Sequence, residues 1–127
     1  MDAPRKPRLR IILIEDSPFD FELIREHLCK ELDCEVVEVR SHVMLLNELD
    51  RALPDVMVSD SNVPRFDGFV ALDYMKVMHP DIPFIFCSGN DSQMLQNSAR
   101  NRGAKAWVSK ADLPRLVNEI KRACGMG

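Results

Sequence analysis

The chain has 127 residues, 46% of them hydrophobic and 29% charged, and its 17 Lys and Arg against 20 Asp and Glu give a net charge of −3. This length and balance predict one globular domain and exclude a disordered chain or a fibre. The negative net charge disfavours a nucleic-acid binder or a protein of anionic membrane surfaces, because excess positive charge carries most of the affinity for phosphate.

The first apolar run follows a basic head and meets Glu15 and Asp16 too early for a signal peptide. No apolar stretch approaches the roughly 20 residues that span a bilayer. The four cysteines show no C-x-x-C spacing and no histidine at zinc spacing. We interpret them as buried free thiols, and we expect a cytoplasmic protein.

Short β-rich runs alternate with amphipathic helical segments along the chain. The runs predict strands at residues 9–14, 34–39, 56–59, 82–87 and 104–108. Several are apolar on successive residues, which is typical of strands buried on both faces of a parallel sheet.

Each helical segment opens on a residue that can cap its first turn. In the first segment Ser17 is the predicted N-cap, Pro18 the first helical residue and Asp20 the charged residue of the first turn. The later helices are expected to open at Ser41, at Asp67 or Gly68, at Asp91 or Ser92, and at Asp112.

This alternation predicts a doubly wound parallel sheet with helices on both faces. Five strands fit the flavodoxin-like (βα)5 order 2-1-3-4-5, as a single domain over residues 9–124 with a polar tail at 1–8 and a short C-terminal tail at 125–127. In such folds the ligand binds beyond the carboxyl ends of the strands.

Polar residues follow the predicted strands at that edge: Glu15 and Asp16, Asp60, Ser88 and Lys110. The first and third strands are neighbours in this order, so their three carboxylates converge, and they cannot all stay ionised without compensation. A divalent cation supplies it. Mg²⁺ prefers oxygen ligands of this kind, and the soft ligands that zinc or copper select are missing from this set.

Such a set suits phosphoryl transfer to a carboxylate, in which charge spreads over three oxygens. Mg²⁺ takes one oxygen, Lys110 a second, and Ser88 with a nearby backbone N–H the third. Asp60 is the best-placed nucleophile, because Glu15 and Asp16 are needed for the metal.

Four segments, at residues 12–17, 54–68, 83–89 and 103–110, now carry a family resemblance. The chain resembles the receiver domain of a two-component response regulator, over essentially residues 9–124. One motif alone is weak evidence, but four in order, each at a strand end, are specific. The resemblance implies a histidine kinase or histidine phosphotransfer protein as the phosphoryl donor.

The resemblance implies that Asp60 is the phosphoacceptor. It further implies that Asp16 and Asp60 ligate Mg²⁺, or Mn²⁺ in its place, through their side chains. Glu15 would act through bound water, and the backbone carbonyl of Asn62 would be a further ligand.

Four more roles follow from the resemblance. Ser88 would be the switch hydroxyl, with Gly89 beside it in the phosphoryl-binding loop. Lys110 would pair with the phosphoryl group, and Trp107 would occupy the switch aromatic position.

The sequence departs from the usual family pattern in three places. Ala111 follows Lys110 where the family often has proline, so we expect a trans peptide bond there. Trp107 stands where Tyr or Phe is usual. Asn62 and Asn90 are two amides at positions that tune dephosphorylation, and if they orient water they predict a short-lived phosphoryl group.

The leading hypothesis is therefore a signalling switch rather than an enzyme, one that assists its own phosphorylation and dephosphorylation. Phosphorylation would shift the face built from the fourth helix, fifth strand and fifth helix, which is also a candidate surface for a dimer or a downstream partner. An attached output domain would lie outside this chain. One alternative is a degenerate receiver that only binds partners. A less favoured one is an Mg²⁺-dependent aspartyl-phosphate phosphatase, which needs an acid where Asn62 stands.

Overall fold

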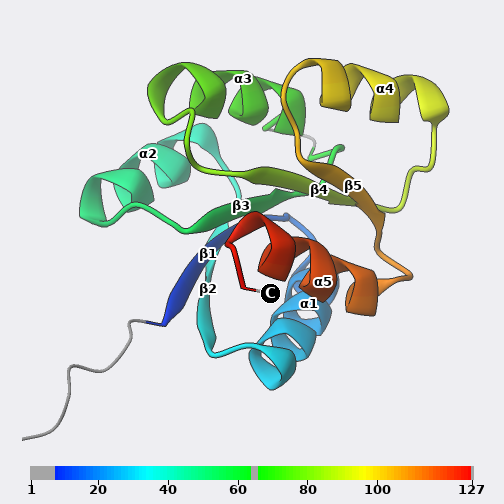
Figure 1. Ribbon diagram of the computed structural model, residues 1–127. Coiled ribbons are helices and arrows are strands. Elements are labelled where there is room, and N and C mark those ends of the chain that lie inside the picture. Colours follow the sequence, from blue (N-terminus) through cyan, green and yellow to red (C-terminus); the bar gives the residue numbers. More distant parts are fainter. Residues whose placement is uncertain (1–7, 64–65, 127) are drawn as a thin grey trace, which may run out of the picture.

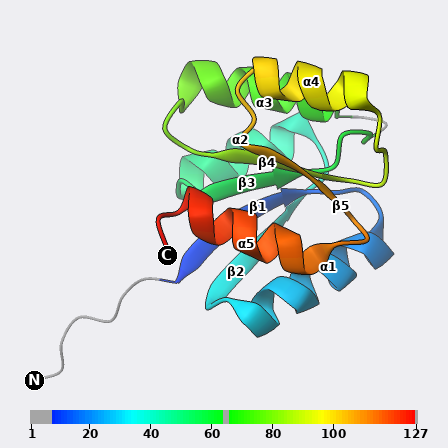
Figure 2. The same ribbon diagram turned by 45° about the vertical axis from the view of Figure 1, so that its right-hand side comes forward.

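The computed structural model describes residues 8–63 and 66–126, so all but the last residue of the predicted tail 1–8 lies outside the described part. Five parallel strands form one sheet in the order β2-β1-β3-β4-β5. Helices α1 and α5 cover one face, and α2, α3 and α4 cover the other (Figures 1 and 2). The predicted flavodoxin-like order is confirmed.

The strands are β1 (Leu9–Ile14), β2 (Cys34–Val39), β3 (Val56–Ser59), β4 (Phe84–Ser88) and β5 (Ala106–Ser109). The first three match their predicted bounds, whereas the last two begin two residues later than predicted. Ile82 and Ala104 are apolar, but each belongs to a turn: their N–H groups donate to the carbonyls of His79 and Ala99. These turns bring the chain back to the sheet before pairing begins.

The helices are α1 (Pro18–Glu31), α2 (His42–Arg51), α3 (Gly68–Met78), α4 (Gln93–Asn101) and α5 (Leu113–Ala123). Each begins after a side chain that accepts a backbone N–H of the first turn; these N-caps are Ser17, Ser41, Asp67, Ser92 and Asp112. The sequence offered two possible starts for α3 and for α4. The capping hydrogen bonds show that the N-caps are Asp67 and Ser92. Within the described residues no helix is both long enough and apolar enough to cross a membrane.

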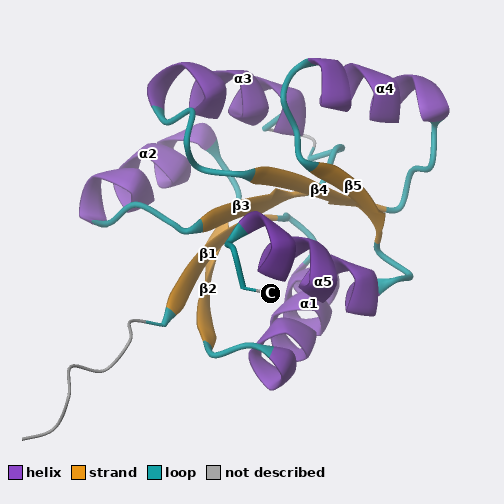
Figure 3. Cartoon of the chain, in the orientation of Figure 1, coloured by secondary structure: helices purple, strands orange, loops and turns teal. Residues whose placement is uncertain are grey.

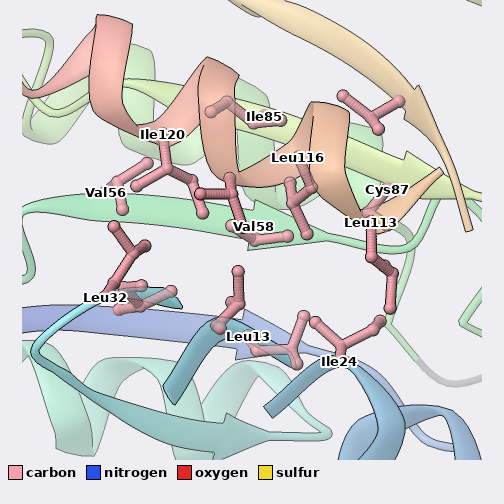
Figure 4. Packing of buried hydrophobic residues seen from close by; sticks show 14 of the residues in the cluster. Leu13, Ile24, Leu32, Val56, Val58, Ile85, Cys87, Leu113, Leu116 and Ile120 are labelled. Atoms are coloured by element: carbon pink, nitrogen blue, oxygen red, sulfur yellow. The ribbon is translucent and has the colours of Figure 1, made fainter. Parts of the chain in front are cut away.

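Alternate residues of β1 feed two separate hydrophobic cores. Ile11 and Leu13 face α1 and α5, while Ile12 and Ile14 face α2 and α3. Figure 4 shows the first core, in which Leu13 and Val58 of the sheet meet Ile24, Leu116 and Ile120 of the helices. Helices cover both faces of the sheet (Figure 3), and in such folds ligands bind at the carboxyl ends of the strands and the loops beyond them.

The cysteines only partly follow the expectation of buried thiols. All four are free, and Cys34 and Cys87 are buried, but Cys29 is exposed and Cys124 is half-buried. Cys29 is exposed because it follows the buried Leu28 on α1, so the helix turns its side chain away from the sheet.

Candidate functional site

Backbone hydrogen bonds place the residues that follow β1 and β3 side by side. The Asp60 N–H donates to the carbonyl of Ile14 at 2.9 Å, and the Glu15 N–H donates to Val39 at 3.2 Å. Glu15 is only 1% exposed and Asp60 8%. Two carboxylates therefore lie close together at the carboxyl edge of the sheet, with little access to water.

Gly68 allows the chain after β3 to fold back against the phosphoacceptor candidate. A Cβ atom at this position would lie 2.4 Å from the Asp60 carbonyl oxygen and 2.9 Å from the Phe86 ring. Any side chain would collide with backbone, so the loop that carries Asp60 requires glycine where α3 begins.

Lys110, which follows β5, contacts the acidic residues at this edge. Its backbone N–H donates to the Ser88 carbonyl at 3.0 Å, which holds Lys110 beside the end of β4. Its ammonium Nζ lies 2.7 Å from Glu15 Oε1, 2.8 Å from Asp20 Oδ2 and 3.1 Å from Asp60 Oδ2. One cation thus bridges β5, β3, β1 and α1.

Asp20 is a site residue that the sequence analysis missed. It is the charged residue of the first turn of α1, as predicted, and its N–H donates to Ser17 Oγ at 3.2 Å. The same turn directs its carboxylate to Lys110. Its position in the sequence could have predicted this role. Because α1 begins at the edge where β1 ends, an acid in its first turn lies next to the site.

Burial and charge shift two pKa values in this cluster. Burial raises the pKa of Glu15, although the Lys110 ammonium and the Ser17 N–H oppose the shift. Burial lowers the pKa of Lys110, but hydrogen bonds to Asp20 and Glu15 and the charge of Asp60 outweigh it, so the net shift is upward. Lys110 therefore stays cationic among more carboxylates than it can neutralise.

The oxygen donors at this edge fit a hard cation. Within residues 8–63 and 66–126 no three Asp, Glu, His or Cys side chains are arranged to hold a metal alone. Asp16 is exposed and makes no hydrogen bond or ion pair within that part of the chain. Mg²⁺ needs only one or two carboxylates, because it keeps several waters. The described carboxylates at this edge therefore suit a cation that keeps part of its water shell.

Opposite the charged residues, the site contains two uncharged hydroxyl groups, those of Ser88 and Ser61. Ser88 Oγ, 2% exposed as a residue, accepts the Asn90 N–H at 3.0 Å and lies 2.7 Å from Ser61 Oγ. An open pocket brings this side and the acidic side together; it is lined by Asp60, Asn62, Ser88, Gly89, Asn90, Asp91 and Lys110. Most of the residues singled out from the sequence therefore meet in one pocket.

Trp107 lies outside the pocket but is tied to its rim. The side chain is 8% exposed, with its ring centroid 5.0 Å from that of Phe86 and 6.3 Å from that of Phe69. Its indole N–H donates to the Asn90 carbonyl at 2.9 Å. Asn90 thus joins the serine hydroxyl, through its N–H, to the aromatic side chain, through its carbonyl.

Two details refine the expectations about the loops. The Lys110–Ala111 peptide bond is trans, like the other peptide bonds of the described residues. Asn90 Oδ1 accepts the Ser92 N–H at 2.9 Å, so its side-chain oxygen is engaged in the loop before α4.

A doubly wound sheet with a lysine-bridged acidic pocket at its carboxyl edge defines an α/β receiver-type signalling domain. A family model described as "Response regulator receiver domain" matches residues 11–121 of the chain. The chain therefore belongs to the response regulator receiver domain family. Proteins of this kind are signalling domains and generally not classical enzymes, and they typically bind Mg²⁺.

Curated relatives span both short and long proteins. The chain is 28% identical over 117 residues to the chemotaxis protein CheY of Listeria monocytogenes, covering 91% of this chain and 98% of the relative. It is 29% identical to a protein-glutamate methylesterase/protein-glutamine glutaminase of Geobacter metallireducens, covering 90% of this chain but 32% of that relative. The same unit thus occurs alone and within larger proteins.

Solved structures support the fold. The signal receiver domain of an HD domain-containing protein from Pseudomonas fluorescens superposes with a TM-score of 0.84 at 21% identity, over 98% of this chain and 92% of that one. The response regulator domain of Thermotoga maritima CheB gives 0.81 at 19% identity, over 95% and 99%. The architecture is therefore common to receivers of different proteins.

Proposed function

We propose that the chain, through a receiver unit at residues 9–124, takes a phosphoryl group onto Asp60 from a phosphohistidine of a histidine kinase or histidine phosphotransfer protein. One observation carries the proposal: the Asp60 carboxylate lines an open pocket 3.1 Å from a lysine ammonium. A nucleophile and a cation that can stabilise the developing charge are thus already together.

In the transfer step an Asp60 carboxylate oxygen attacks phosphorus, and the phosphorus–nitrogen bond to the donor imidazole breaks. The imidazole leaves with the electron pair of that bond and takes up a proton. Asp16, Asp60 and the Asn62 carbonyl would hold Mg²⁺ or Mn²⁺, and Glu15 would act through water. When bound, the cation neutralises charge on the phosphoryl oxygens.

The pocket residues would then bind the product. Lys110 exchanges one of its carboxylate partners for a phosphoryl oxygen, which its flexible stem and compact charge permit. Ser88 donates its hydroxyl to a second oxygen, and the Gly89 N–H lies in the same loop. A Cβ on Gly89 would meet nothing within 4 Å, so no other part of the chain packs against this residue where it lines the pocket.

The face formed by α4, β5 and α5 would read out phosphorylation. The Trp107–Asn90 hydrogen bond links the Ser88 loop to β5, so movement of that loop reaches this face. The surface is rich in cations, with Arg100, Lys105 and Arg115 around one hollow. A downstream partner, an output domain of a longer chain, or a second copy would dock there.

The test is intact mass after incubation with Mg²⁺ and acetyl phosphate. We expect the native chain to gain one phosphoryl group, and we expect no gain without Mg²⁺ or in Asp60→Asn. Lys30→Ala, an exposed change on α1, is the matched control that should still be phosphorylated. Absence of an adduct under rapid quench, together with no binding of beryllofluoride, would favour a phosphorylation-independent interaction module.

The lifetime of the phosphoryl group tests the two amides. If Asn62 and Asn90 orient a hydrolytic water, the adduct decays quickly, and Asn62→Ala slows the decay. The measurement is the phosphorylated fraction against time after removal of the donor. A decay that is slow in the native chain would contradict this role.

A further inference from the structure

Ser61 lies directly behind the switch hydroxyl and has no assigned part in the site. It follows Asp60 at the end of β3 and is 9% exposed. Its Oγ lies 2.7 Å from Ser88 Oγ, within the distance of a normal O–H···O hydrogen bond. The two serines are 27 positions apart in the sequence, so neighbouring strand ends create the contact.

The hydrogen-bonding capacity of a hydroxyl restricts how this pair works. A serine oxygen has one proton and two lone pairs. On Ser88 one lone pair already accepts the Asn90 N–H at 3.0 Å. If Ser61 donates to the second lone pair, both acceptor positions are filled, and the only remaining capacity of Ser88 is its own proton.

The pocket decides which hydroxyl donates. Ser88 lines the open pocket beside Asp60 and Lys110, whereas Ser61 is not among the residues that line it. A proton on Ser88 can therefore be used by an oxygen in the pocket. Ser88 is the only polar partner of the Ser61 side chain in the described part of the structure, so donation by Ser61 gives the Ser61 proton its acceptor and keeps the Ser88 proton for the pocket.

We propose that Ser61 is a positioning residue that directs the proton of the Ser88 hydroxyl at the phosphoryl group. The proposal rests on the function proposed above, because it needs Ser88 to meet a phosphoryl oxygen. Ser61 polarises Ser88 in a short donor chain that runs from Ser61 through Ser88 to the phosphoryl oxygen.

The opposite arrangement makes an opposite prediction. If Ser88 donated to Ser61, the phosphoryl group would have to compete with Ser61 for that proton. Removal of the Ser61 hydroxyl would then strengthen phosphoryl binding. The sign of the effect of Ser61→Ala therefore separates the two arrangements.

The experiment measures the affinity of the full chain for beryllofluoride in the presence of Mg²⁺, with this phosphoryl analogue as the probe. We expect Ser61→Ala to weaken binding about tenfold, the effect of one hydrogen bond of about 1.4 kcal/mol. Ser61→Thr keeps a hydroxyl and should restore most of the affinity. Ser98→Ala, on α4 and outside the pocket, is the matched control, and thermal melting checks that each variant folds.

A double-mutant cycle shows whether Ser61 acts through Ser88. With Ser88→Ala in place, Ser61→Ala should have no further effect on the affinity for beryllofluoride. An equal loss in both backgrounds, or binding by Ser61→Ala as tight as native or tighter, would overturn the proposal for Ser61. Failure of the native chain to bind the analogue would instead overturn the proposed function.

Discussion

Two cations stand at opposite ends of the central sheet, and each is surrounded by acidic groups. At the amino end, Arg10 of β1 lies 3.1 Å from Glu35 and 2.9 Å from Glu48, and its backbone N–H donates to Asp55 at 2.7 Å. At the carboxyl end, Lys110 contacts Glu15, Asp20 and Asp60. The two clusters look alike, but their charges and hydrogen bonds differ.

The Arg10 cluster is the more nearly balanced of the two, because two cations, Arg10 and Arg51, face the carboxylates of Glu35, Glu48 and Asp55. The guanidinium also donates to the carbonyls of Ala52 at 3.2 Å and Glu48 at 3.3 Å, and Arg51 brings a second cation to Glu48. The planar fork of arginine suits such a fixed set of acceptors. This cluster ties β1 to β2 and α2, and its excess of negative charge is smaller than that around Lys110.

The Lys110 cluster is not balanced. Three carboxylates face one ammonium, and the exposed Asp16 adds a further negative charge at the same edge. A lysine is a compact charge on a flexible stem, so it can change partners when a new anion arrives. The comparison teaches that the larger excess of negative charge, rather than the number of ion pairs, distinguishes the end that carries the proposed phosphoacceptor.

The largest expected effect on stability is at the amino end. Arg10→Ala should lower the free energy of unfolding by about 3 kcal/mol, because it leaves the half-buried Glu48 without its principal cation. Arg10→Lys, which keeps the charge but loses the fork, should cost less. Urea unfolding measures both variants. A loss that Mg²⁺ repairs would contradict the structural role of this cluster.

Magnesium should stabilise the chain through the carboxyl end only. At a free Mg²⁺ concentration of a hundred times Kd we expect a gain of about 2.7 kcal/mol in the free energy of unfolding. Asp60→Asn removes a proposed ligand and should lose most of this gain, whereas Arg10→Lys should keep it. Urea unfolding with Mg²⁺ or with a chelator measures the difference. An equal gain in all three proteins would show that the ion acts elsewhere.

Asp20 tests whether the newly found carboxylate belongs to the cluster. Asp20→Asn should cost about 1 kcal/mol, because its contact with Lys110 at 2.8 Å is partly screened by solvent. The matched control is Glu22→Gln on the same helix, which breaks an exposed pair with Arg25 and should cost less than Asp20→Asn, because solvent screens that pair more strongly. Thermal melting compares the two. Equal costs would make Asp20 an ordinary surface acid.

The smallest expected effect concerns two thiols, one toward each end of the sheet. Burial is the largest cause that raises the pKa of Cys34 and of Cys87 from 9.0 to about 12, and the charges near each thiol contribute less. A raised folded-state pKa favours the neutral thiol, so this contribution to stability is complete below pH 9 and is lost as the pH rises toward 12.

Thiol reactivity checks this expectation. At pH 8 Ellman's reagent should react first with the exposed Cys29 and should reach Cys34 and Cys87 only after unfolding in urea. The Cys29→Ser variant should lose the fast phase. Fast labelling of Cys87 in the folded chain would show that charge at the carboxyl end, rather than burial, controls this thiol.

The sequence by itself determined the architecture and most of the pocket. Alternating strands and helices predict a doubly wound parallel sheet whose five strands fit the order 2-1-3-4-5, and caps such as Ser17 and Ser41 mark where helices start. Residues placed at strand ends, such as Asp60 and Lys110, must meet at one edge of a parallel sheet. Family membership follows from the same residues.

Only the tertiary structure decided which partner each side chain takes. In the sequence, Asp20 is recognisable only as an acid at the start of a helix, but in the fold it contacts Lys110. Ser61 has no distinctive sequence pattern, but in the fold it contacts Ser88. The hydrogen bond from the Trp107 indole N–H to the Asn90 carbonyl could not be predicted from the sequence either, because no local pattern encodes it. Hydrogen bonds between residues far apart in the chain depend on distances of a few tenths of an ångström, which packing sets and residue spacing does not.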